Sequence, residues 1–428
     1  MPRATKTAKA APGHRVKDLA LAPQGAQRIR WAEAHMPVLM ALRKQFAKER
    51  PLEGVRLAAC LHVTKETAVL MRTLQVGGAE VAICGSNPLS TQDDVAAALV
   101  EDGMAVFAAR GVDDKTYYAN VDDCLATRPH YTMDDGGDLV SHLHTKRKEW
   151  LSGVRAGTEE TTTGVTRFRA MAKEGVLRFP VVAINDAMTK HFFDNRYGTG
   201  QSTIDGLLRA TSSLLAGKTF VVAGYGWCGK GLAMRAKGMG SNVVVTEIDP
   251  MRALEATMDG FRVMTLEQAA KEADFVVTVT GNKSVVTTPH FKAFKDGVII
   301  ANSGHFDAEI DLPLLRKLSK TVQTVKENVQ EFHLKDGRRL YLVGEGRLVN
   351  LAAAEGHPPE VMDMSFANQA MALRWLAVDE PKLDAQVYPM PEVLDRKVAA
   401  LKLEAMGIRI DTLTKEQERY MTGWREGT

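Results

Sequence analysis

Apolar and polar residues follow one another along the first half of the chain in short blocks that indicate alternating strands and helices. Apolar runs at 55–61, 79–84 and 104–109 have the length and residue types of buried strands. Amphipathic segments at 64–74, capped by Thr64, and at 90–100, capped by Ser90 or Thr91, indicate helices between them. Strands that alternate with helices through short links predict a parallel α/β sheet.

A second series of the same kind begins near residue 214. Apolar runs at 218–223, 242–246, 275–280 and 297–301 predict strands, and residues 230–238 predict a helix. The predicted fold class is therefore α/β, with two doubly wound parallel-sheet domains and a short helical C-terminal segment.

The segments outside these two series have other patterns. Residues 22–48 and 361–378 carry helical spacing, and the chain from residue 394 reads as charged helix and tail. The polar, glycine-rich stretch 133–164 predicts functional loops. Residues 1–17 are basic and have no apolar core of a signal peptide, so we expect a disordered tail there.

Composition narrows the class of protein. The chain has 428 residues, of which 45% are hydrophobic and 25% charged, the balance of a soluble protein with more than one domain. The formal net charge is only +3, so no nucleic-acid partner is predicted. No apolar run approaches the roughly 18 to 20 residues that span a bilayer, so no membrane partner is predicted either. The four cysteines lie far apart and form no CxxC pair, which favours reduced thiols and a cytoplasmic location.

The segment GYGWCG at 224–229 matches the dinucleotide-binding pattern GxGxxG. It follows an apolar strand and opens a helix, and Glu247 lies 18 residues after its last glycine. The glycines allow a tight turn, close approach of a pyrophosphate and close helix–strand packing, while the helix N-terminus attracts phosphate. Glu247 would accept hydrogen bonds from ribose hydroxyls and repel a 2′-phosphate, so NAD is predicted over NADP, although nearby Arg252 weakens that preference.

Polar residues also gather where predicted strands end, which is where parallel sheets bind ligands. They include His62, the pair Lys190 and Asp194, His305 and His357. Alone, His62 could equally be satisfied by the local backbone, and Lys190 with Asp194 at i, i+4 would be a surface ion pair. Their occurrence together favours a functional cleft. No HxxxH or HExxH spacing lies on a plausible helix, so no metal site is predicted.

In the order and spacing of its motifs, the chain resembles the S-adenosylhomocysteine hydrolase (adenosylhomocysteinase) family from about residue 31 to 369. The motifs that carry the resemblance are LHVTKETA (61–68), STQD (90–93), DDGGD (134–138), EETTTG (159–164), Lys190 with Asp194 and Asn195, GYG (224–226) with GKG (229–231), EIDP (247–250), GHFD (304–307), and LVNL (348–351) with GHP (356–358).

The resemblance implies two domains around a deep cleft and a homo-oligomer, expected to be a tetramer. A substrate-binding domain would comprise residues 18–195 and 359–396, and a Rossmann NAD-binding domain would comprise 196–358. Residues 397–428 would form a C-terminal helical tail. Each subunit would hold one NAD.

The implied reaction is the reversible hydrolysis of S-adenosyl-L-homocysteine to adenosine and L-homocysteine. The thioether at C5′ is a poor leaving group on an unactivated carbon. Oxidation of the 3′-hydroxyl makes the 4′-hydrogen acidic, and its loss allows elimination of homocysteine. Water then adds and the ketone is reduced again, so NAD has to stay bound through the cycle.

The resemblance also implies roles for individual residues. Lys190 with Asp194 would take the 3′-hydroxyl proton, Asp135 would be the base near C4′, and His62 and His305 would be acid/base groups on the 5′ side. A lysine base has to be partly neutral. Burial beside a positive nicotinamide ring favours that state and Asp194 opposes it, so the sequence leaves the direction open.

Further residues are implied as ligand contacts. Those for the substrate are Thr64, Glu66, Glu160, Thr161, His357 and Met362. Those for NAD are Thr161, Thr162, Thr163, Asn195, Gly224, Gly226, Trp227, Cys228, Gly229, Glu247, Arg252, Thr280, Asn282, Ser303, Gly304, His305 and Asn350.

The chain departs from the commonest family pattern at several positions, among them Arg252, where many members have Asn, and Thr199, where many have Cys. Trp227 and Cys228 stand where many members have Asp-Val, and the C-terminus lacks the Lys- and Tyr-containing segment that reaches a neighbouring subunit's NAD in many members. The ending resembles the short archaeal and thermophile-like branch, and we therefore expect NAD to exchange more readily.

Some members of that branch are thought to prefer S-inosylhomocysteine. As a carboxylate, Glu66 can accept a hydrogen bond from the amine of adenine but would face the carbonyl of hypoxanthine. An unpaired buried acceptor costs roughly 1 to 3 kcal/mol, so adenosine is the expected product.

Two other functions compete with the hydrolase. An ordinary NAD-dependent dehydrogenase would accumulate NADH in proportion to substrate. A regulatory homologue would bind nucleotide and a partner without turnover, but pure binding does not require Lys190, Asp194 and Asp135 together.

Overall fold

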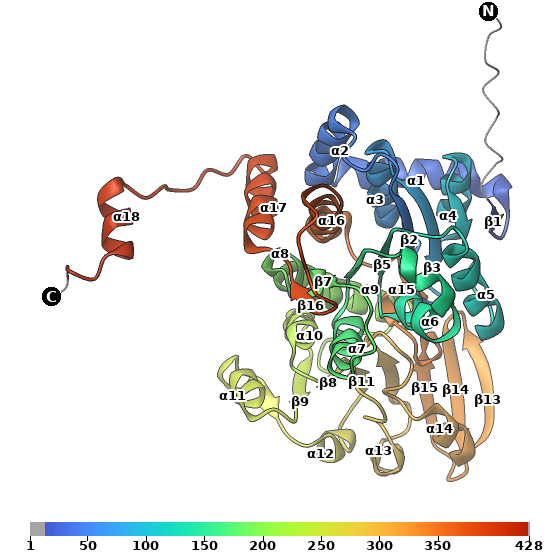
Figure 1. Cartoon of the computed structure of the whole chain (residues 1–428). Coiled ribbons are helices and arrows are strands. Elements are labelled where there is room, and N and C mark those ends of the chain that lie inside the picture. Colours follow the sequence, from blue (N-terminus) through green and yellow to red (C-terminus); the bar gives the residue numbers. More distant parts are fainter. Residues whose placement is uncertain (1–12, 427–428) are drawn as a thin grey trace, which may run out of the picture.

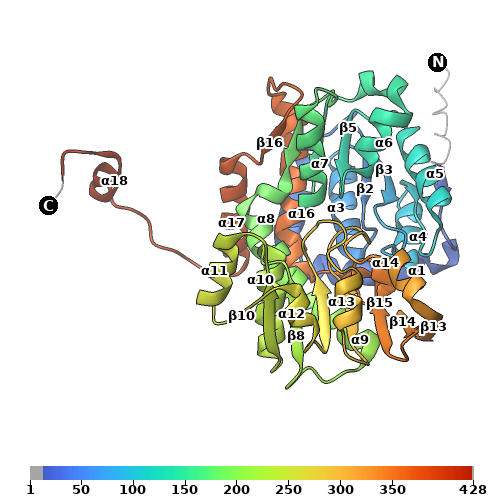
Figure 2. The ribbon, with the colours of Figure 1, turned by 90° about the horizontal axis from the view of Figure 1, so that it is seen from below.

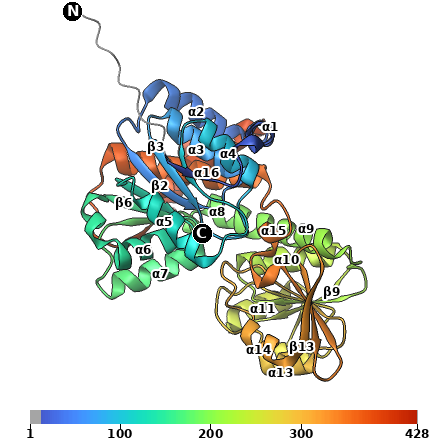
Figure 3. The ribbon, with the colours of Figure 1, turned by 90° about the vertical axis from the view of Figure 1, so that its right-hand side faces the viewer.

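The structure, a computed structural model, describes residues 13–426 as two α/β lobes, each built on an eight-stranded sheet (Figures 1 and 3). The predicted disordered tail of residues 1–17 lies mostly outside the described residues. For its last part the prediction is wrong, because strand β1 (His14–Arg15) pairs in parallel with β4 (Ala105–Phe107) at the edge of the first sheet. Among residues 13–426, no helix is long and apolar enough to cross a membrane.

The first sheet is parallel throughout and has the order β1-β4-β3-β2-β5-β6-β7-β16. Its other strands are β2 (Arg56–Leu61), β3 (Glu80–Gly85), β5 (Tyr131–Asp134), β6 (Ala156–Glu159), β7 (Val181–Ala183) and β16 (Val387–Pro389). Its helices are α1 (Ala22–Ala34), α2 (Pro37–Glu49), α3 (Lys65–Val76), α4 (Asp93–Glu101), α5 (Asp114–Leu125), α6 (Asp138–Lys146) and α7 (Thr162–Lys173). The strand order runs in one direction from β2 and in the other from β5, so a topological switch point lies between these two strands.

The second sheet has the order β10-β9-β8-β11-β12-β15-β14-β13, with a switch point between β8 and β11. Its strands are β8 (Thr219–Ala223), β9 (Asn242–Thr246), β10 (Arg262–Val263), β11 (Phe275–Thr278), β12 (Ile299–Asn302), β13 (Ser319–Lys326), β14 (Val329–Leu334) and β15 (Arg339–Val343). Its helices are α10 (Trp227–Gly238), α11 (Pro250–Met258), α12 (Leu266–Ala270), α13 (Thr288–Ala293) and α14 (Leu312–Leu318). The α/β class is confirmed, but this sheet is not wholly parallel, since β13, β14 and β15 form an antiparallel ladder.

The central strands are buried because helices cover both faces of each sheet. The five residues after Arg56 in β2 and the four after Thr219 in β8 are all buried. Such strands read as nearly continuous apolar runs rather than as alternating ones, which explains why the sequence predicted them well.

The chain crosses between the lobes twice (Figure 3). The first crossing comprises α8 (Met188–Lys190), the π-helical segment η4 (His191–Gly198) and α9 (Thr199–Thr211). The second runs through α15 (Val349–Ala352) into α16 (Pro359–Arg374), which lies beside α3 and α8 (Figure 2). The domain boundaries implied at 195/196 and 358/359 fall within these crossings and stay a prediction.

Three local predictions need correction. The helix expected over 22–48 is two helices, because Pro37 begins α2 and disfavours a helical residue before it. Thr64 caps α3 as predicted, but α4 begins at Asp93 after Gln92, since the Ser90 hydroxyl is bonded to His62 instead. The loops expected over 133–164 are largely regular structure, with α6, the 3-10 helix η2 (Lys148–Gly153) and β6.

The C-terminal region returns to the first lobe. Helix α17 (Glu392–Ala405) packs on α16 and α2 and continues past the implied boundary at residue 396. Its Asp395 carboxylate accepts hydrogen bonds from the backbone N–H groups of Met188 (2.6 Å) and Thr189 (3.0 Å), so it caps the short helix α8. Helix α18 (Lys415–Thr422) lies away from the body of the chain (Figure 1).

The second lobe is held against the first crossing by close backbone packing. A Cβ atom at Gly231 of α10 would lie 1.7 Å from the carbonyl oxygen of Arg196 in η4. A Cβ at Gly200 would in turn lie 2.6 Å from the backbone of Gly231. Glycine at these positions lets the helices approach to backbone contact.

We predict that Gly231→Ala lowers the free energy of unfolding by about 1 to 3 kcal/mol, because α10 has to move away from η4. Calorimetric unfolding temperatures would measure the change. Gly238→Ala is the matched control in the same helix, since its Cβ would meet no atom within 4 Å. Gly231→Ala unfolding at or above the wild-type temperature would contradict the packing argument.

Candidate active site

A cavity of about 1230 Å³ lies where the carboxyl ends of the two sheets face each other. Its walls come from both lobes and from both crossings. Pockets for single small ligands commonly measure about 300 to 1,000 Å³, so this cavity has room for a cofactor and a substrate together.

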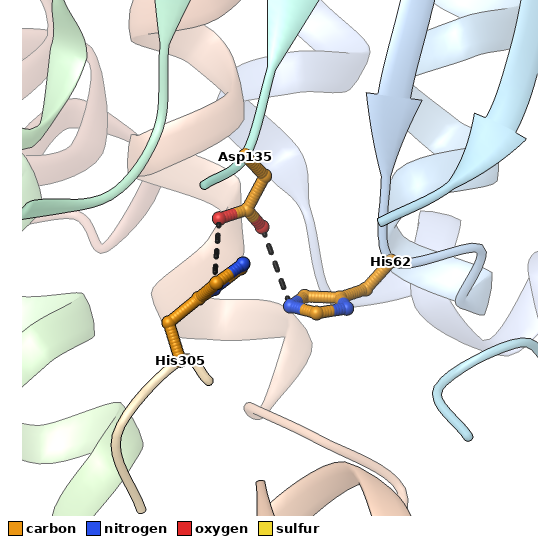
Figure 4. A group of neighbouring side chains, drawn as sticks. All are labelled: His62, Asp135 and His305. Atoms are coloured by element: carbon orange, nitrogen blue, oxygen red, sulfur yellow. Dashed lines mark ion pairs between the residues drawn. The ribbon is translucent and has the colours of Figure 1, made fainter. Parts of the chain in front are cut away.

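At the switch point of the first sheet, His62 follows β2 and Asp135 follows β5. His62 Nε2 lies 3.4 Å from Asp135 Oδ2, and His305 Nδ1, which follows β12 in the other lobe, lies 3.7 Å from Asp135 Oδ1 (Figure 4). His62 Nδ1 also lies 2.8 Å from the Ser90 hydroxyl and 3.1 Å from that of Ser86. The carboxylate therefore stands between two imidazoles, one from each lobe.

Burial favours the neutral form of both imidazoles. Burial lowers the pKa of His62 to about 4, although Asp135 opposes the shift. Burial also lowers the pKa of His305. The ligand atoms of His62, Asp135 and His305 lie within 4.8 Å of one another and are of types that can bind a metal ion. The absence of a metal site, expected from the sequence, therefore stays a prediction.

The approach of His305 requires a glycine after Asp135. Gly136 has a φ of 101°, and a Cβ atom there would lie 2.1 Å from His305 Nε2. A side chain at this position would force the imidazole away from the carboxylate.

Lys190 ends helix α8 and is buried among oxygen atoms. Its Nζ donates to Asp194 Oδ1 (3.0 Å) and Asn195 Oδ1 (2.6 Å) and lies 3.8 Å from Glu160 Oε1. Burial disfavours the charged form, but Asp194 and Glu160 raise the pKa of Lys190 above its usual value. Burial likewise opposes ionisation of Asp194, yet Lys190 lowers its pKa. The sequence left open whether the pKa of Lys190 is raised or lowered. In the chain without ligands it is raised.

Glu160 is the third charged member of this group. It accepts hydrogen bonds from Ser365, and from Gln369 Nε2 at 2.5 Å, both on α16. Burial raises the pKa of Glu160 to about 7, and Lys190 opposes that shift. Sequence reasoning missed both α16 partners, because no local pattern marks residues that meet across more than 200 positions.

The switch point of the second sheet carries the glycine pattern. Gly224 has a φ of 110°, and α10 begins after Gly226 without a side-chain cap, at residues that line the cavity. A Cβ atom at Gly229 would lie 2.0 Å from the carbonyl oxygen of Gly224, so this glycine serves packing. Glu247 directly follows β9 and accepts hydrogen bonds from backbone N–H groups, that of Tyr225 at 2.7 Å among them.

Two features show that this half suits a dinucleotide. The uncapped N-terminus of α10 offers donors for phosphate. Asn350 is buried and lines the cavity, and its Oδ1 accepts no hydrogen bond within the described residues.

The loop after β11 is held by Glu309, which accepts hydrogen bonds from the N–H groups of Thr280 (3.0 Å) and Gly281 (2.8 Å). The sequence did not indicate this positioning role.

Trp227, where the chain departs from the common family pattern, connects the lobes. Its ring centroid lies 5.3 Å from that of His191 and 4.8 Å from that of Phe192, both in η4. Lys230 Nζ lies 4.5 Å from the centroid of the same indole. The substitution thus adds an aromatic contact beside the cofactor half of the cavity.

The structure brings the predicted site residues together. Gly229 is buried and does not line the cavity, whereas the others all do. On the side of the first sheet these are His62, Thr64, Glu66, Asp135, Glu160, Lys190, Asp194, His357 and Met362. The residues implied as NAD contacts come from α7 of the first lobe, from both crossings and from the second lobe: Thr161, Thr162, Thr163, Asn195, Gly224, Gly226, Trp227, Cys228, Glu247, Arg252, Thr280, Asn282, Ser303, Gly304, His305 and Asn350. Their individual roles stay predictions.

Two facing switch points, one with a dinucleotide pattern and one with buried acid/base groups, define an NAD-binding α/β enzyme. Residues 13–156 match the family model described as S-adenosyl-L-homocysteine hydrolase, and residues 195–356 match the model of its NAD-binding domain. The chain belongs to this family.

Its relatives align over nearly their whole length. The adenosylhomocysteinase of Aquifex aeolicus is 59% identical over 414 residues, which cover 96% of this chain and 99% of that protein. The adenosylhomocysteinase of Sulfurisphaera tokodaii is 56% identical over 97% of this chain and 100% of its own length. The S-inosyl-L-homocysteine hydrolase of Methanocaldococcus jannaschii is 55% identical, again over 97% and 100%.

We predict that, because of His62, the free energy of unfolding decreases as the pH is lowered from about 6.5 to about 4. The unfolded chain binds a proton at His62 near pH 6.5, whereas the folded chain does so only near pH 4, so acid favours unfolding across this window. Denaturant unfolding of wild type and His62→Asn at several pH values would test this, with a shallower loss expected for the variant.

The exposed His14 offers a matched control. His14→Asn is expected to keep the wild-type pH slope. An identical slope for His62→Asn and wild type would show that His62 is not held neutral by burial.

Proposed function

We propose that the chain catalyses the reversible hydrolysis of S-adenosyl-L-homocysteine to adenosine and L-homocysteine with NAD as its cofactor. The observation that carries the proposal is the single cavity in which the dinucleotide half faces Lys190, Asp135, His62 and His305. Membership of the family supports the same reaction.

NAD, when bound, supplies reversible hydride transfer at the 3′ carbon of the substrate. The groups that fit it are the glycine turn at 224–226, Glu247 and Asn350. Lys190 takes the 3′-hydroxyl proton. Its ammonium is stabilised in the chain alone, and a further positive charge in the cavity lowers the pKa of a buried lysine. Asp194 and Asn195 hold its Nζ in place throughout.

Asp135 takes the 4′-proton, because its carboxylate stands between the two imidazoles. The proton passes through an adjacent histidine to the departing homocysteine sulfur as the C5′–S bond breaks. In the second half, a neutral imidazole takes a proton from the attacking water and passes it to Asp135, which returns it to C4′. Lys190 then returns its proton to the 3′ oxygen as the ketone is reduced again. One water is consumed, and no net charge or electron pair is gained.

One relative supports a second candidate, the hydrolysis of S-inosyl-L-homocysteine. Glu66 favours the adenosine compound. Its carboxylate lines the cavity, and its buried Oε1 accepts no hydrogen bond within the described residues, so it suits an amine rather than a carbonyl.

We also propose a homotetramer in the cytoplasm. The exposed apolar side chains of Tyr420, Met421 and Trp424 at and after α18, a helix that lies away from the body of the chain (Figure 1), support association with other copies. The four free cysteines support a reducing compartment. Light scattering of the purified protein would give the number of subunits.

The proposed reaction is tested by incubating the NAD-loaded protein with S-adenosyl-L-homocysteine while following free thiol and NADH absorbance. The hydrolase releases thiol and adenosine with no net NADH. A dehydrogenase accumulates NADH in proportion to substrate, and a binding protein yields neither product. The same assay with S-inosyl-L-homocysteine separates the two candidate substrates.

We predict that Lys190→Met lowers turnover by about 10²- to 10⁴-fold, the usual contribution of a positioned acid/base group. Binding of adenosine should change little, because the variant keeps the cavity wall and loses only the ammonium. Steady-state kinetics and equilibrium dialysis would measure the two quantities.

Lys295→Met is the control, since Lys295 lies in the second lobe, half exposed and paired with Asp274. It is expected to turn over at the wild-type rate. Turnover by Lys190→Met within a few-fold of wild type would remove Lys190 from the role of base.

A further inference from the structure

The cavity wall that faces the purine base in the proposed reaction begins with two oppositely charged neighbours. Lys65 and Glu66 start helix α3, directly after its cap Thr64. Their side chains are only 9% and 2% exposed, and Lys65 Nζ lies 3.1 Å from Glu66 Oε1. Two charged side chains so deeply buried need a structural or functional reason.

Glu66 is not satisfied by this pairing. Lys65 is close enough to act on it as a charge, yet the buried Oε1 accepts no hydrogen bond within the described residues. Since Glu66 lines the cavity, its carboxylate keeps capacity for a hydrogen bond from a donor on the ligand beside the ion pair with Lys65.

Lys65 is held from its other side. Its Nζ donates to Glu355 Oε2 at 2.9 Å, and Arg28 contacts the same oxygen at 3.1 Å. Gln92 ties the group together, because its side chain accepts from the Lys65 N–H (3.1 Å) and donates to the Glu355 carbonyl (3.4 Å). Glu355 belongs to the second crossing, between α15 and α16, so the ammonium is fixed by the segment that joins the lobes.

The pKa of Glu66 lies above its usual value, and the two largest influences on it act in opposite directions. Burial raises its pKa, and the charge of Lys65 lowers it. No other ionised side chain contributes clearly to this balance. Without Lys65, hydrogen bonds from the backbone and from Thr64 would still favour the carboxylate, but the largest influence that opposes burial would be lost, and the balance would move toward the neutral form.

We propose that Lys65, pinned by Glu355, is a positioning residue for purine selectivity, because its charge holds Glu66 as a carboxylate that accepts from an exocyclic amine. The inference rests on the proposed function. A carboxylate meets the amine of adenine favourably and the carbonyl of hypoxanthine unfavourably. A neutral carboxyl group can donate its proton to that carbonyl and so loses the discrimination.

The test compares kcat/KM for S-adenosyl- and S-inosyl-L-homocysteine in wild type and Lys65→Met. The variant keeps the aliphatic length and removes the charge. We expect the selectivity ratio to fall by about tenfold, the factor that corresponds to one pKa unit, mainly through a gain with the inosine compound. Lys65→Arg should restore the ratio. Glu355→Gln, which alters a half-exposed residue, should lower it less.

Outcomes that overturn the inference differ from those that overturn the function. An equal loss with both substrates in Lys65→Met would assign Lys65 a merely structural role, and an unchanged ratio would remove it from base selection. Equilibrium dialysis with adenosine and inosine gives the same ratio without turnover. If wild type released no thiol from S-adenosyl-L-homocysteine, the proposed function would fail whatever the ratio showed. Lys295→Met is expected to leave the kcat/KM ratio and the ratio from equilibrium dialysis at their wild-type values.

Discussion

The contact between the carboxyl edges of the two sheets is the constraint on which the whole site depends. Neither lobe holds the acid/base group alone, since Asp135 comes from the first and His305 from the second, 3.7 Å apart. The contact forms only because Gly136 leaves room for the imidazole. Asp135 thus faces His62 along its own sheet and His305 across the cleft. Any change that separates the lobes disassembles this group, whereas the pair Lys190 and Asp194 is built within the first crossing and stays intact.

Much of this arrangement was predictable from the sequence, because the informative patterns are local. The glycines at 224–229, the strand before them and Glu247 lie within one βαβ unit. Thr64 indicated the start of α3, because a threonine side chain can cap the N-terminus of a helix. Strand ends mark ligand sites in any parallel sheet, and both switch points carry predicted residues.

The rest depends on contacts between distant parts of the chain. Ser365 and Gln369 hold Glu160 across more than 200 residues, and no periodicity reports such a pairing. The protonation states of Lys190 and Asp194 depend on how deeply both are buried, which tertiary structure alone determines. The antiparallel ladder of β13 to β15 was missed because the pattern of short apolar runs is the same for either strand direction.

The return of the chain to the first lobe has a consequence for biosynthesis. Strand β16 completes the first sheet only with residues 387–389, and the cap of α8 is supplied by Asp395. As the polypeptide leaves the ribosome, the inserted second lobe is complete first, and domains generally fold as units during synthesis. Lys190 therefore acquires its final setting only near the end of translation. The glycine turn and Glu247 are thus complete well before the setting of the lysine, so the two halves of the cavity mature at different times.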